Sequence, residues 1–367
     1  MAKIRLFINN FIAIFVFYFL KYYFSVMSSK PVNKKDFLLV NLGQIGDLSI
    51  LSTVIDSYID IGLSNNVDFL INEKYLELFK YLVPNANIKT INIKKYSSNI
   101  FYRIQKVSHM RLINYQKVIN LTSFNRIMTD EIVLLQNAGE YYCLKNNWNS
   151  LRPFFRKIMV NKYTGILGCE EVNEYKRHFE VFKKFFNKDI NSIVLSKKEK
   201  LNGNKYFEKY IVISSTTSQK ISAWDINNFT ELIRLLIVNF NVILLGDKLI
   251  NKLEDITSAK FLNLSGKTTI VKAVNIIKNC DLYIGNDSGL THIAIKYGVP
   301  IICILGGGAF NFYFPIFESE NTKYIYKKLD CFNCDWYCKY QEPKCLTEIS
   351  VGEVYNEALK ILNRVYV

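Results

Sequence analysis

The sequence predicts an α/β protein of two doubly wound parallel sheets in tandem, each with helices on both faces. Short apolar runs rich in β-branched residues alternate with stretches of helical spacing through both halves of the chain. A length of 367 residues also exceeds what one hydrophobic core usually holds. Finally, residues 195–206 are rich in Lys, Asn and Gly and separate the two alternating series, as a linker between domains does.

Residues 1–30 precede the first strand and are predicted to form a helix. Their apolar run, Phe11–Leu20, is flanked by Lys3, Arg5 and Lys21 and is shorter than the roughly 20 residues that cross a bilayer. No small-residue cleavage site follows, which argues against a removed signal peptide. Two interpretations stay open: a helix lying on an anionic membrane surface, and a helix packed on the protein's own surface. A transmembrane anchor fits the segment less well than either.

The first domain is predicted at residues 36–195. Its apolar runs have the length and composition of buried parallel strands, at 37–42, 67–71 and 117–121. Between the first two runs, apolar residues recur at helical spacing, at Leu48, Leu51, Ile55, Tyr58 and Ile59. This alternation of strand and helix predicts a parallel sheet with helices on both faces.

The second domain is predicted at residues 206–367 and repeats the pattern. Strands are expected at 211–215, 241–245, 261–264, 281–285 and 300–305, and helices around 226–240, 269–279 and just after 288. Gly298, which stands before Val-Pro, is expected to end the last of these helices.

The chain is basic, with a net charge of +15 and a pI near 9.2. Part of this excess follows from a composition rich in Ile, Asn and Lys, and the remainder predicts an anionic partner such as a phosphate or an acidic membrane face. The sequence contains no nucleic-acid recognition module and no Arg-rich stripe, so nucleic acid is not an expected partner.

Polar turns follow three of the predicted strands, where open parallel sheets bind their ligands. The stretch NLGQIGD places Asp47 after the first strand, although its glycine spacing matches no dinucleotide fingerprint. The stretch SSTTSQK offers hydroxyls and a lysine as phosphate donors, among them Thr216, Thr217 and Lys220. An ordinary loop rich in Ser and Thr is the competing interpretation.

The third turn lies within DLYIGNDSGLTHIAIKYGVP, between strand and helix. Asp287 or Ser288 is placed to cap the helix, and Gly289 allows a ligand to approach the backbone amides. His292 follows within the first helical turn. A helix N-terminus binds phosphate well, so the turn is a candidate phosphate site. A capped turn with a core histidine is the alternative.

Together these stretches resemble glycosyltransferase family 9, whose best-known members are the ADP-heptose:lipopolysaccharide heptosyltransferases. The resemblance runs from about residue 36 to the C-terminus and is strongest over 264–306, where a D-S-G-x-x-H-x-A pattern follows a G-K-T stretch. It implies the GT-B fold, with two Rossmann-like domains facing a cleft, and an inverting sugar transfer that needs no metal or other cofactor.

The resemblance also implies roles for the residues of the three turns. Asp47 is the general base for the acceptor hydroxyl, and Lys220 stabilises the leaving nucleotide. The diphosphate is held by Thr216, Thr217 and Lys220, and the donor's sugar and phosphates are contacted by Asp287, Ser288, Gly289 and His292. The expected donor is a nucleotide sugar such as ADP-heptose, and the expected acceptor is a glycolipid or other surface glycan. The enzyme would be cytoplasmic or peripheral on the inner membrane.

One departure leaves the donor open. Family members usually offer a carboxylate for the nucleotide ribose, and here Asp247 precedes KLINKLED with no Glu at the expected place. A nucleotide-sugar epimerase of the same fold, a non-catalytic nucleotide-sugar-binding relative and a protein acceptor are the alternatives to glycolipid glycosylation.

Eight cysteines fall into two groups. Four stand alone among apolar neighbours and are expected to be small buried hydrophobes: Cys143, Cys169, Cys280 and Cys303. The other four have the spacing C-x2-C-x3-C-x6-C: Cys331, Cys334, Cys338 and Cys345. Four clustered thiols predict a structural zinc or iron site. Disulfides, disfavoured in a reducing cytoplasm, and free thiols are the alternatives.

Overall fold

The structure is a computed structural model that describes residues 2–27, 30–58, 66–123, 127–145, 153–168, 173–186, 206–250, 253, 255–316, 319–340 and 342–365. Residues 195–205 of the expected linker, and Cys169, lie outside the described residues. The chain divides into two compact units. Unit 1 comprises Met1–Leu48, Tyr58–Glu171 and Arg177–Asp189, and unit 2 comprises Ser49–Ser57, Val172–Lys176 and Ile190–Val367.

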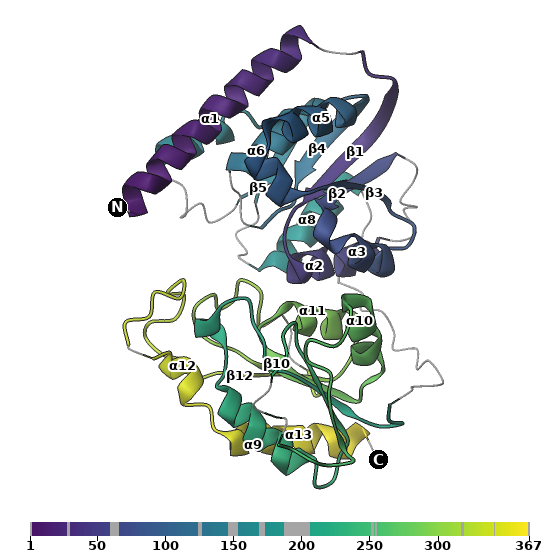
Figure 1. Ribbon diagram of the computed structural model, residues 1–367, viewed down its shortest axis with the longest axis vertical. Helices are drawn as coiled ribbons and strands as arrows, with labels where there is room; N and C mark the ends of the chain where they lie inside the picture. The colour runs from purple at the N-terminus through teal and green to yellow at the C-terminus, as the bar shows by residue number, and fades with distance from the viewer. Residues whose placement is uncertain are drawn as a thin grey trace. The chain divides into compact units, whose positions relative to one another are not determined.

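The described part of unit 1 contains one parallel sheet of six strands in the order β3-β2-β1-β4-β5-β6 (Figure 1). The strands are β1 (Asn33–Asn41), β2 (Val67–Asn72), β3 (Asn87–Ile91), β4 (Ile113–Asn120), β5 (Asn137–Leu144) and β6 (Gly165–Leu167). This is the Rossmann order, in which the direction of winding reverses between the first and fourth strands.

The helices around this sheet are α1 (Ala2–Val26), α2 (Ile45–Asp56), η2 (Glu73–Tyr75), α3 (Leu76–Leu82), α4 (Ile93–Ser98), α5 (Ile100–Met110), α6 (Ile127–Leu134), α7 (Pro153–Val160) and α8 (Glu174–Phe186). The first residues of α8 and most of α2 belong to unit 2. Among the helices of the described residues, none combines the length and the apolar character that a bilayer span requires.

Strand β1 starts earlier than the apolar pattern predicts. Lys34 and Lys35 lie within the Lys-rich stretch expected to be a joint, yet they pair in register with Asn114 and Tyr115 of β4. The Lys35 ammonium lies 2.6 Å from the buried Asp68 carboxylate. This ion pair neutralises the buried Asp68 carboxylate and holds Lys35 in the strand. The strand therefore extends into a stretch where hydrophobic periodicity gives no signal.

Unit 2 repeats the same topology. The described strands form one parallel six-stranded sheet in the order β12-β11-β10-β7-β8-β9, which is again the Rossmann order. They are β7 (Ile211–Ser214), β8 (Val242–Leu245), β9 (Phe261–Asn263), β10 (Leu282–Asn286), β11 (Ile301–Ile304) and β12 (Thr322–Ile325). The helices are η3 (Lys220–Ser222), α9 (Ile226–Leu236), α10 (Ile270–Asn279), α11 (Gly289–Lys296), α12 (Lys344–Thr347) and α13 (Val351–Val365). The two doubly wound sheets predicted from the sequence are confirmed.

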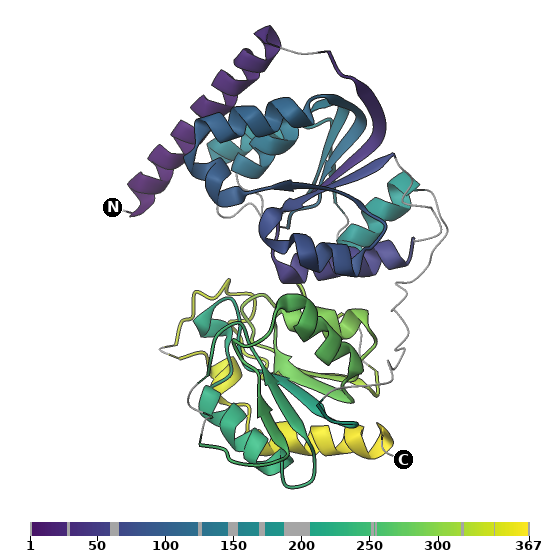
Figure 2. The same cartoon turned by 45° about the vertical axis from the view of Figure 1, so that its right-hand side comes forward.

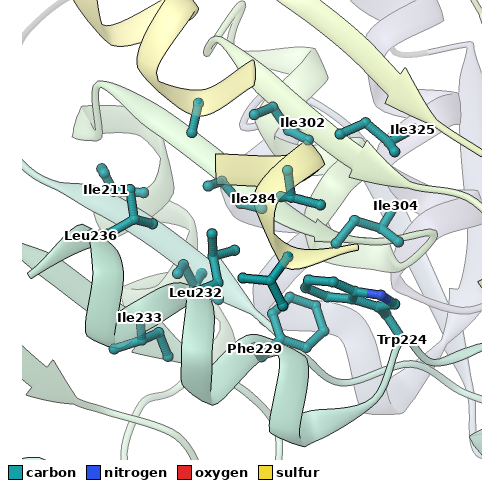
Figure 3. Packing of buried hydrophobic residues seen from close by; sticks show 14 of the residues in the cluster. Ile211, Trp224, Phe229, Leu232, Ile233, Leu236, Ile284, Ile302, Ile304 and Ile325 are labelled. Carbon is teal, nitrogen blue, oxygen red and sulfur yellow. The ribbon is translucent and has the colours of Figure 1, made fainter. Parts of the chain in front are cut away.

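The core of unit 2 forms where α9 and α13 cover one face of its sheet (Figures 2 and 3). Phe229, Leu232 and Leu236 of α9 are fully buried against the isoleucines of β7, β10 and β11. The spacing of three and four residues puts these side chains on one face of the helix. Trp224, placed just before α9, closes the end of this core and donates its Nε1 hydrogen to the Ile349 carbonyl at 3.0 Å.

Helix α11 ends as its sequence predicts. Gly298 has φ of +61°, a conformation in which glycine carries no Cβ penalty. The Gly298 amide donates to the Ile295 carbonyl at 2.9 Å and the Val299 amide to the Ala294 carbonyl at 3.0 Å. These paired bonds are a Schellman motif, which satisfies carbonyls left open at the helix end.

Candidate active site

The predicted site residues follow strands at the switch points of the two sheets. In unit 1, Asp47 comes after β1, which pairs with β4. In unit 2, Thr216, Thr217 and Lys220 follow β7, and Asp287 follows β10, which pairs with β7. The carboxyl ends of strands at such points are where open α/β sheets bind ligands. Each sheet therefore presents its polar turns at the expected edge.

Asp47 is held in place by its own turn. It is the third residue of α2, and its Oδ2 atom accepts a hydrogen bond from the Gln44 amide at 2.7 Å, the reciprocal half of a capping box. A Cβ atom on Gly43 would lie 2.5 Å from the Cβ, Cγ and Oδ2 atoms of Asp47. The glycine therefore leaves the space that the carboxylate occupies. The start of a helix also favours a negatively charged side chain at this position.

Hydrogen bonds to residues at the ends of β1 and β4 also fix this turn. The Leu42 amide donates to the Thr122 hydroxyl at 3.1 Å, and the Gly43 amide donates to the Asn41 side chain at 3.0 Å. Thr122 stands just after β4, so the ends of β1 and β4 are joined directly. Sequence reasoning missed Thr122, because only the sheet order brings residues 42 and 122 together.

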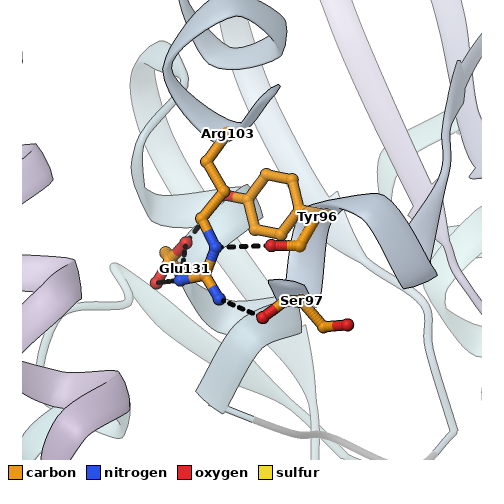
Figure 4. A network of polar contacts seen from close by, with 4 residues as sticks. All are labelled: Tyr96, Ser97, Arg103 and Glu131. Atoms are coloured by element: carbon orange, nitrogen blue, oxygen red, sulfur yellow. Dashed lines mark hydrogen bonds and ion pairs between the residues drawn. The ribbon is translucent and has the colours of Figure 1, made fainter. Parts of the chain in front are cut away.

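Other buried carboxylates of unit 1 have structural partners. Figure 4 shows Glu131 of α6 accepting hydrogen bonds from the Tyr96 hydroxyl at 2.8 Å and from Arg103 Nη1 at 3.3 and 3.4 Å. Burial raises the pKa of Glu131, and Arg103 counters that shift. Asp130 accepts from the Tyr163 hydroxyl at 2.6 Å, and burial raises its pKa to about 7. Glu131 thus joins α6 to α4 and α5, and Asp130 joins α6 to the loop before β6.

The turn after β7 is partly ordered by its own hydroxyls. The Ser222 hydroxyl donates to the Thr217 hydroxyl at 3.1 Å, and the Thr217 hydroxyl donates to the Gln219 carbonyl at 2.5 Å. Thr216 and Thr217 are half-buried, whereas Lys220 is exposed at the start of η3. The turn thus combines fixed hydroxyls with a cation free to approach an anion.

Asn286 joins the turn after β7 to the end of β10. Its side-chain oxygen accepts from the Trp224 amide at 3.0 Å, and its side-chain nitrogen donates to the Ser215 carbonyl at 2.9 Å. The side chain is fully buried. Asn286 therefore fixes the stretch that carries Thr216 and Lys220 against the strand that leads into Asp287. The sequence carries no signal of this role, because only the fold brings residues 215, 224 and 286 together.

Helix α11 starts without a side-chain cap. Ser288 is the N-cap residue, and its hydroxyl makes no capping hydrogen bond, lying instead 3.3 Å from the Thr291 hydroxyl. Thr291 donates onward to the Asn286 carbonyl at 2.6 Å. The first amides of a helix lack intrahelical partners, so those at Gly289 and its neighbours can serve a ligand.

Asp287 is half-buried beside this helix start, and burial raises the pKa of its carboxyl to about 7. A protonated carboxyl can donate a hydrogen bond to a phosphate or a sugar hydroxyl, whereas an ionised one repels a phosphate. The chemistry of the turn therefore depends on pH near neutrality.

His292 is buried within unit 2. Its ring stacks on Phe314 with centroids 4.4 Å apart, and its Nδ1 atom lies 2.9 Å from the Tyr175 hydroxyl. Burial lowers the pKa of His292 to about 3, so the ring is neutral at pH 7. Nδ1 is engaged with Tyr175, which leaves Nε2 as the ring nitrogen for any further contact. Tyr175 and Phe314 had no signal in the sequence, since neither belongs to the motif.

The cysteine segment, residues 331–345, lies after β12. Cys331, Cys334, Cys338 and Cys345 line one cavity, together with Phe332 and Trp336. Burial raises the pKa of the Cys345 thiol, and the other three thiols add to that shift. Within the described residues, however, no group of three or more His, Cys, Asp or Glu side chains is arranged to hold a metal ion as it stands. Four thiols are a suitable set of ligands for a tetrahedral metal site. In this structure, however, they are not arranged around one common position.

Three consecutive glycines, residues 306–308, lie directly against the cysteine segment. The Asn333 amide donates to the Gly307 carbonyl at 2.7 Å, and the Asp335 amide donates to the Gly308 carbonyl at 2.9 Å. A Cβ atom on Gly307 would collide with the Phe332 ring, and one on Gly308 with the Trp336 ring. The GGG stretch that follows β11 is therefore explained by the close approach of the cysteine segment.

Comparison with known proteins identifies the family. Residues 137–334 match the family model described as Glycosyltransferase family 9 (heptosyltransferase). Lipooligosaccharide heptosyltransferase 2 of Campylobacter jejuni (serotype O:2) is 25% identical over 252 residues, which cover 65% of this chain and 74% of that protein.

Solved structures share the fold at low sequence identity. A glycosyltransferase of family 9 from Veillonella parvula has a TM-score of 0.70 at 17% identity, over 92% of this chain and 100% of that one. E. coli heptosyltransferase WaaC with ADP has a TM-score of 0.62 at 14% identity, over 90% and 99% of the two chains. The iron-containing dodecameric glycosyltransferase TibC from enterotoxigenic E. coli has a TM-score of 0.55 at 13% identity, over 91% and 78%.

The matched region covers more than half of the chain, and both sheets have the Rossmann order. The chain therefore belongs to glycosyltransferase family 9 and is a glycosyltransferase of the GT-B fold.

Proposed function

We propose that this enzyme transfers a heptose from ADP-heptose to a sugar hydroxyl of a lipid-linked surface glycan such as lipopolysaccharide. The observation that carries the proposal is the pair of turns after β7 and β10, which Asn286 holds together at the switch point of one sheet. They combine hydroxyls, a lysine and an uncapped helix start, which are the groups that bind a diphosphate.

The donor's diphosphate is assigned to the turns of unit 2. Thr216 donates a hydroxyl hydrogen bond, Thr217 donates one once its hydroxyl turns away from the Gln219 carbonyl, and Lys220 supplies the positive charge for the leaving nucleotide. On the other turn, Ser288 and Gly289 offer backbone amides, and Asp287 donates to a donor oxygen when it is protonated. His292 reaches the donor through Nε2, while Tyr175 and Phe314 hold the ring in position.

The acceptor is activated by Asp47. In this step the acceptor oxygen forms a bond to the anomeric carbon, and the bond from that carbon to the diphosphate oxygen breaks. The acceptor's proton passes to Asp47, and the nucleoside diphosphate leaves with the bonding electrons. A single displacement inverts the anomeric centre and uses one base. Lys220 and the α11 amides stabilise the leaving charge, which is the role that a metal ion plays in other transferases.

Similar proteins support the choice of donor and acceptor. WaaC was solved with ADP, and the Campylobacter relative is named for lipooligosaccharide. The net charge of +15 suits a negatively charged acceptor. We place the enzyme in the cytoplasm, at the inner membrane face.

A structural metal ion is proposed for the four clustered cysteines, outside the chemistry of transfer. Its support is the shared cavity, the number of thiols and the iron reported for TibC. Cys331, Cys334, Cys338 and Cys345 would have to rotate their side chains toward one another to complete the site. The ion would fix the segment on Gly307 and Gly308.

A thermal-shift screen with ADP-, GDP- and UDP-sugars tests the donor assignment. Ligand at a hundredfold excess over its Kd stabilises by about 2.7 kcal/mol, so the ADP-sugar should raise Tm by several degrees. Lys220→Ala should abolish most of this rise. Equal shifts with all three donors, or none with ADP-sugar, would contradict the assignment. Incubation with the donor alone should leave its sugar unchanged. Epimerisation of the sugar under these conditions would show that the enzyme is an epimerase.

A further inference from the structure

Helix α1 has two apolar faces, and the described residues cover one of them. Ile14, Phe17, Leu20 and Phe24 are buried in the core of unit 1, where α1 contacts α6 and α7. This packing accounts for one side of the helix. Figures 1 and 2 both show α1 along the outside of unit 1, with no described element over its outer side.

The outer face is aromatic and aliphatic between Phe11 and Val26. Phe15 is 67% exposed and Tyr22 is 71% exposed. At 100° per residue the exposed apolar side chains fall on one arc of the helix: Phe11, Ile12, Phe15, Tyr18, Phe19, Tyr22 and Val26. Contiguous exposed apolar patches mark sites of protein or membrane contact.

The edges of this face are basic. Lys21 lies at the side of the arc, and the Lys162 ammonium lies 5.6 Å from the centroid of the Tyr18 ring. Lys157 of the neighbouring helix α7 is exposed. The first 32 residues contain no Asp or Glu. An apolar face with basic edges complements an anionic leaflet, whereas a second copy of the chain would bring like charges together.

We propose that the outer face of α1 docks the enzyme on an anionic membrane surface, with the helix lying in the plane of the interface. The aromatic rings enter the boundary between headgroups and acyl chains, and Lys21, Lys157 and Lys162 face the headgroups. The inner face stays packed on unit 1. The two interpretations that the sequence left open are then both correct. The inner face of the helix packs on the protein's own surface, and the outer face contacts the membrane. Resting on the proposed function, this docking brings the enzyme to the membrane that carries its lipid-linked acceptor.

Vesicle flotation of the full chain tests the docking face. Phosphatidylcholine vesicles with about 30% phosphatidylglycerol are compared with pure phosphatidylcholine, because anionic lipid attracts basic residues near the surface. The test variant is Phe15→Ser with Phe19→Ser, which spares the inner face; deleting α1 would uncover the core instead. The matched control is Phe101→Ser with Val238→Ser, which removes two apolar side chains that are 79% and 66% exposed elsewhere.

The wild type and the control should float with anionic vesicles, and the test variant should partition at least tenfold less. High salt should weaken the wild type only in part, since screening leaves the apolar contribution. Equal flotation of test variant and wild type would overturn the proposal. Light scattering that shows a dimer disrupted by the test variant, without vesicle binding by the wild type, would assign the face to a second copy. The ADP-sugar thermal shift is read in parallel, so failure of docking and failure of the proposed function are distinguishable.

Discussion

The absence of a side chain at Gly43 makes room for the Asp47 carboxylate. The Asp47 carboxylate occupies the space where a Cβ atom of residue 43 would stand, and the Gln44 amide holds it there. The sequence predicted a flexible turn with a carboxylate. It could not predict this contact, because the glycine spacing alone does not fix which atoms meet.

Gly43→Ala should therefore lower the transfer rate by displacing Asp47. A shift of about 1 Å in a catalytic group costs on the order of 100-fold. Donor affinity should stay near that of the wild type, because Gly43 belongs to unit 1 and the turns assigned to the donor belong to unit 2. Initial rates and donor titration measure the two effects. Gly352→Ala is the control, since nothing lies within 4 Å of a Cβ atom there. A Gly43→Ala enzyme with full activity would show that the position of Asp47 does not matter.

Asp287 should make stability fall as the pH rises. Burial raises its folded pKa to about 7 from an ordinary value of 3.8, so between these values the folded state keeps a proton that the unfolded state has released. Stability from this group is complete below about pH 4 and is lost as the pH passes 7.

Asp287→Asn removes that dependence. The Tm of the variant, relative to the wild type, should rise between pH 5 and pH 7.5, whereas Asp247→Asn, at an exposed position, should show no such trend. Comparison with the variant cancels the opposite effect of His292, whose pKa is lowered. A constant difference between variant and wild type across this range would refute the raised pKa of Asp287.

At the scale of elements, hydrophobic periodicity predicted most strands and helices, and the differences lie at the ends of the elements. The helix expected at 226–240 ends at Leu236, where Ile237 closes the last turn by bonding back to Ile233. Strand β1 extends into the Lys-rich stretch because Lys35 pairs with Asp68. Lys35 and Asp68 lie 33 residues apart in the sequence, so their pairing leaves no mark on local periodicity.

The cysteine segment carries a prediction about metal content. If its four thiols bind an ion, the purified protein should contain about one zinc or iron per chain. Cys334→Ser should lower that content, and Cys280→Ala, at a buried thiol elsewhere, should not. Elemental analysis with thiol titration measures both. Absence of both metals, with four freely titrating thiols in the segment, would rule out the site.

Across the whole molecule, the alternation of strands and helices was enough to predict two doubly wound sheets. The repeated strand order then placed Asp47, Lys220 and Asp287 at carboxyl ends next to a switch point. The exchange of short segments between the units could not be predicted. Ser49–Ser57 belongs to unit 2, where the Lys296 ammonium lies 2.5 Å from Asp56 and 3.1 Å from the Ser52 carbonyl. The sequence carries no signal of these contacts, because the partners of Lys296 lie 244 and 240 residues away.

The central claim is that Asp47 takes the proton of the acceptor hydroxyl, and single-turnover transfer by Asp47→Asn tests it most directly. General-base catalysis typically contributes about 10²–10⁴-fold, so transfer should slow by that factor while donor affinity stays near wild type. Lys220→Ala serves as the contrast: it should weaken donor binding as well, because its charge meets the diphosphate before and during reaction. Transfer by Asp47→Asn at the wild-type rate would contradict the mechanism.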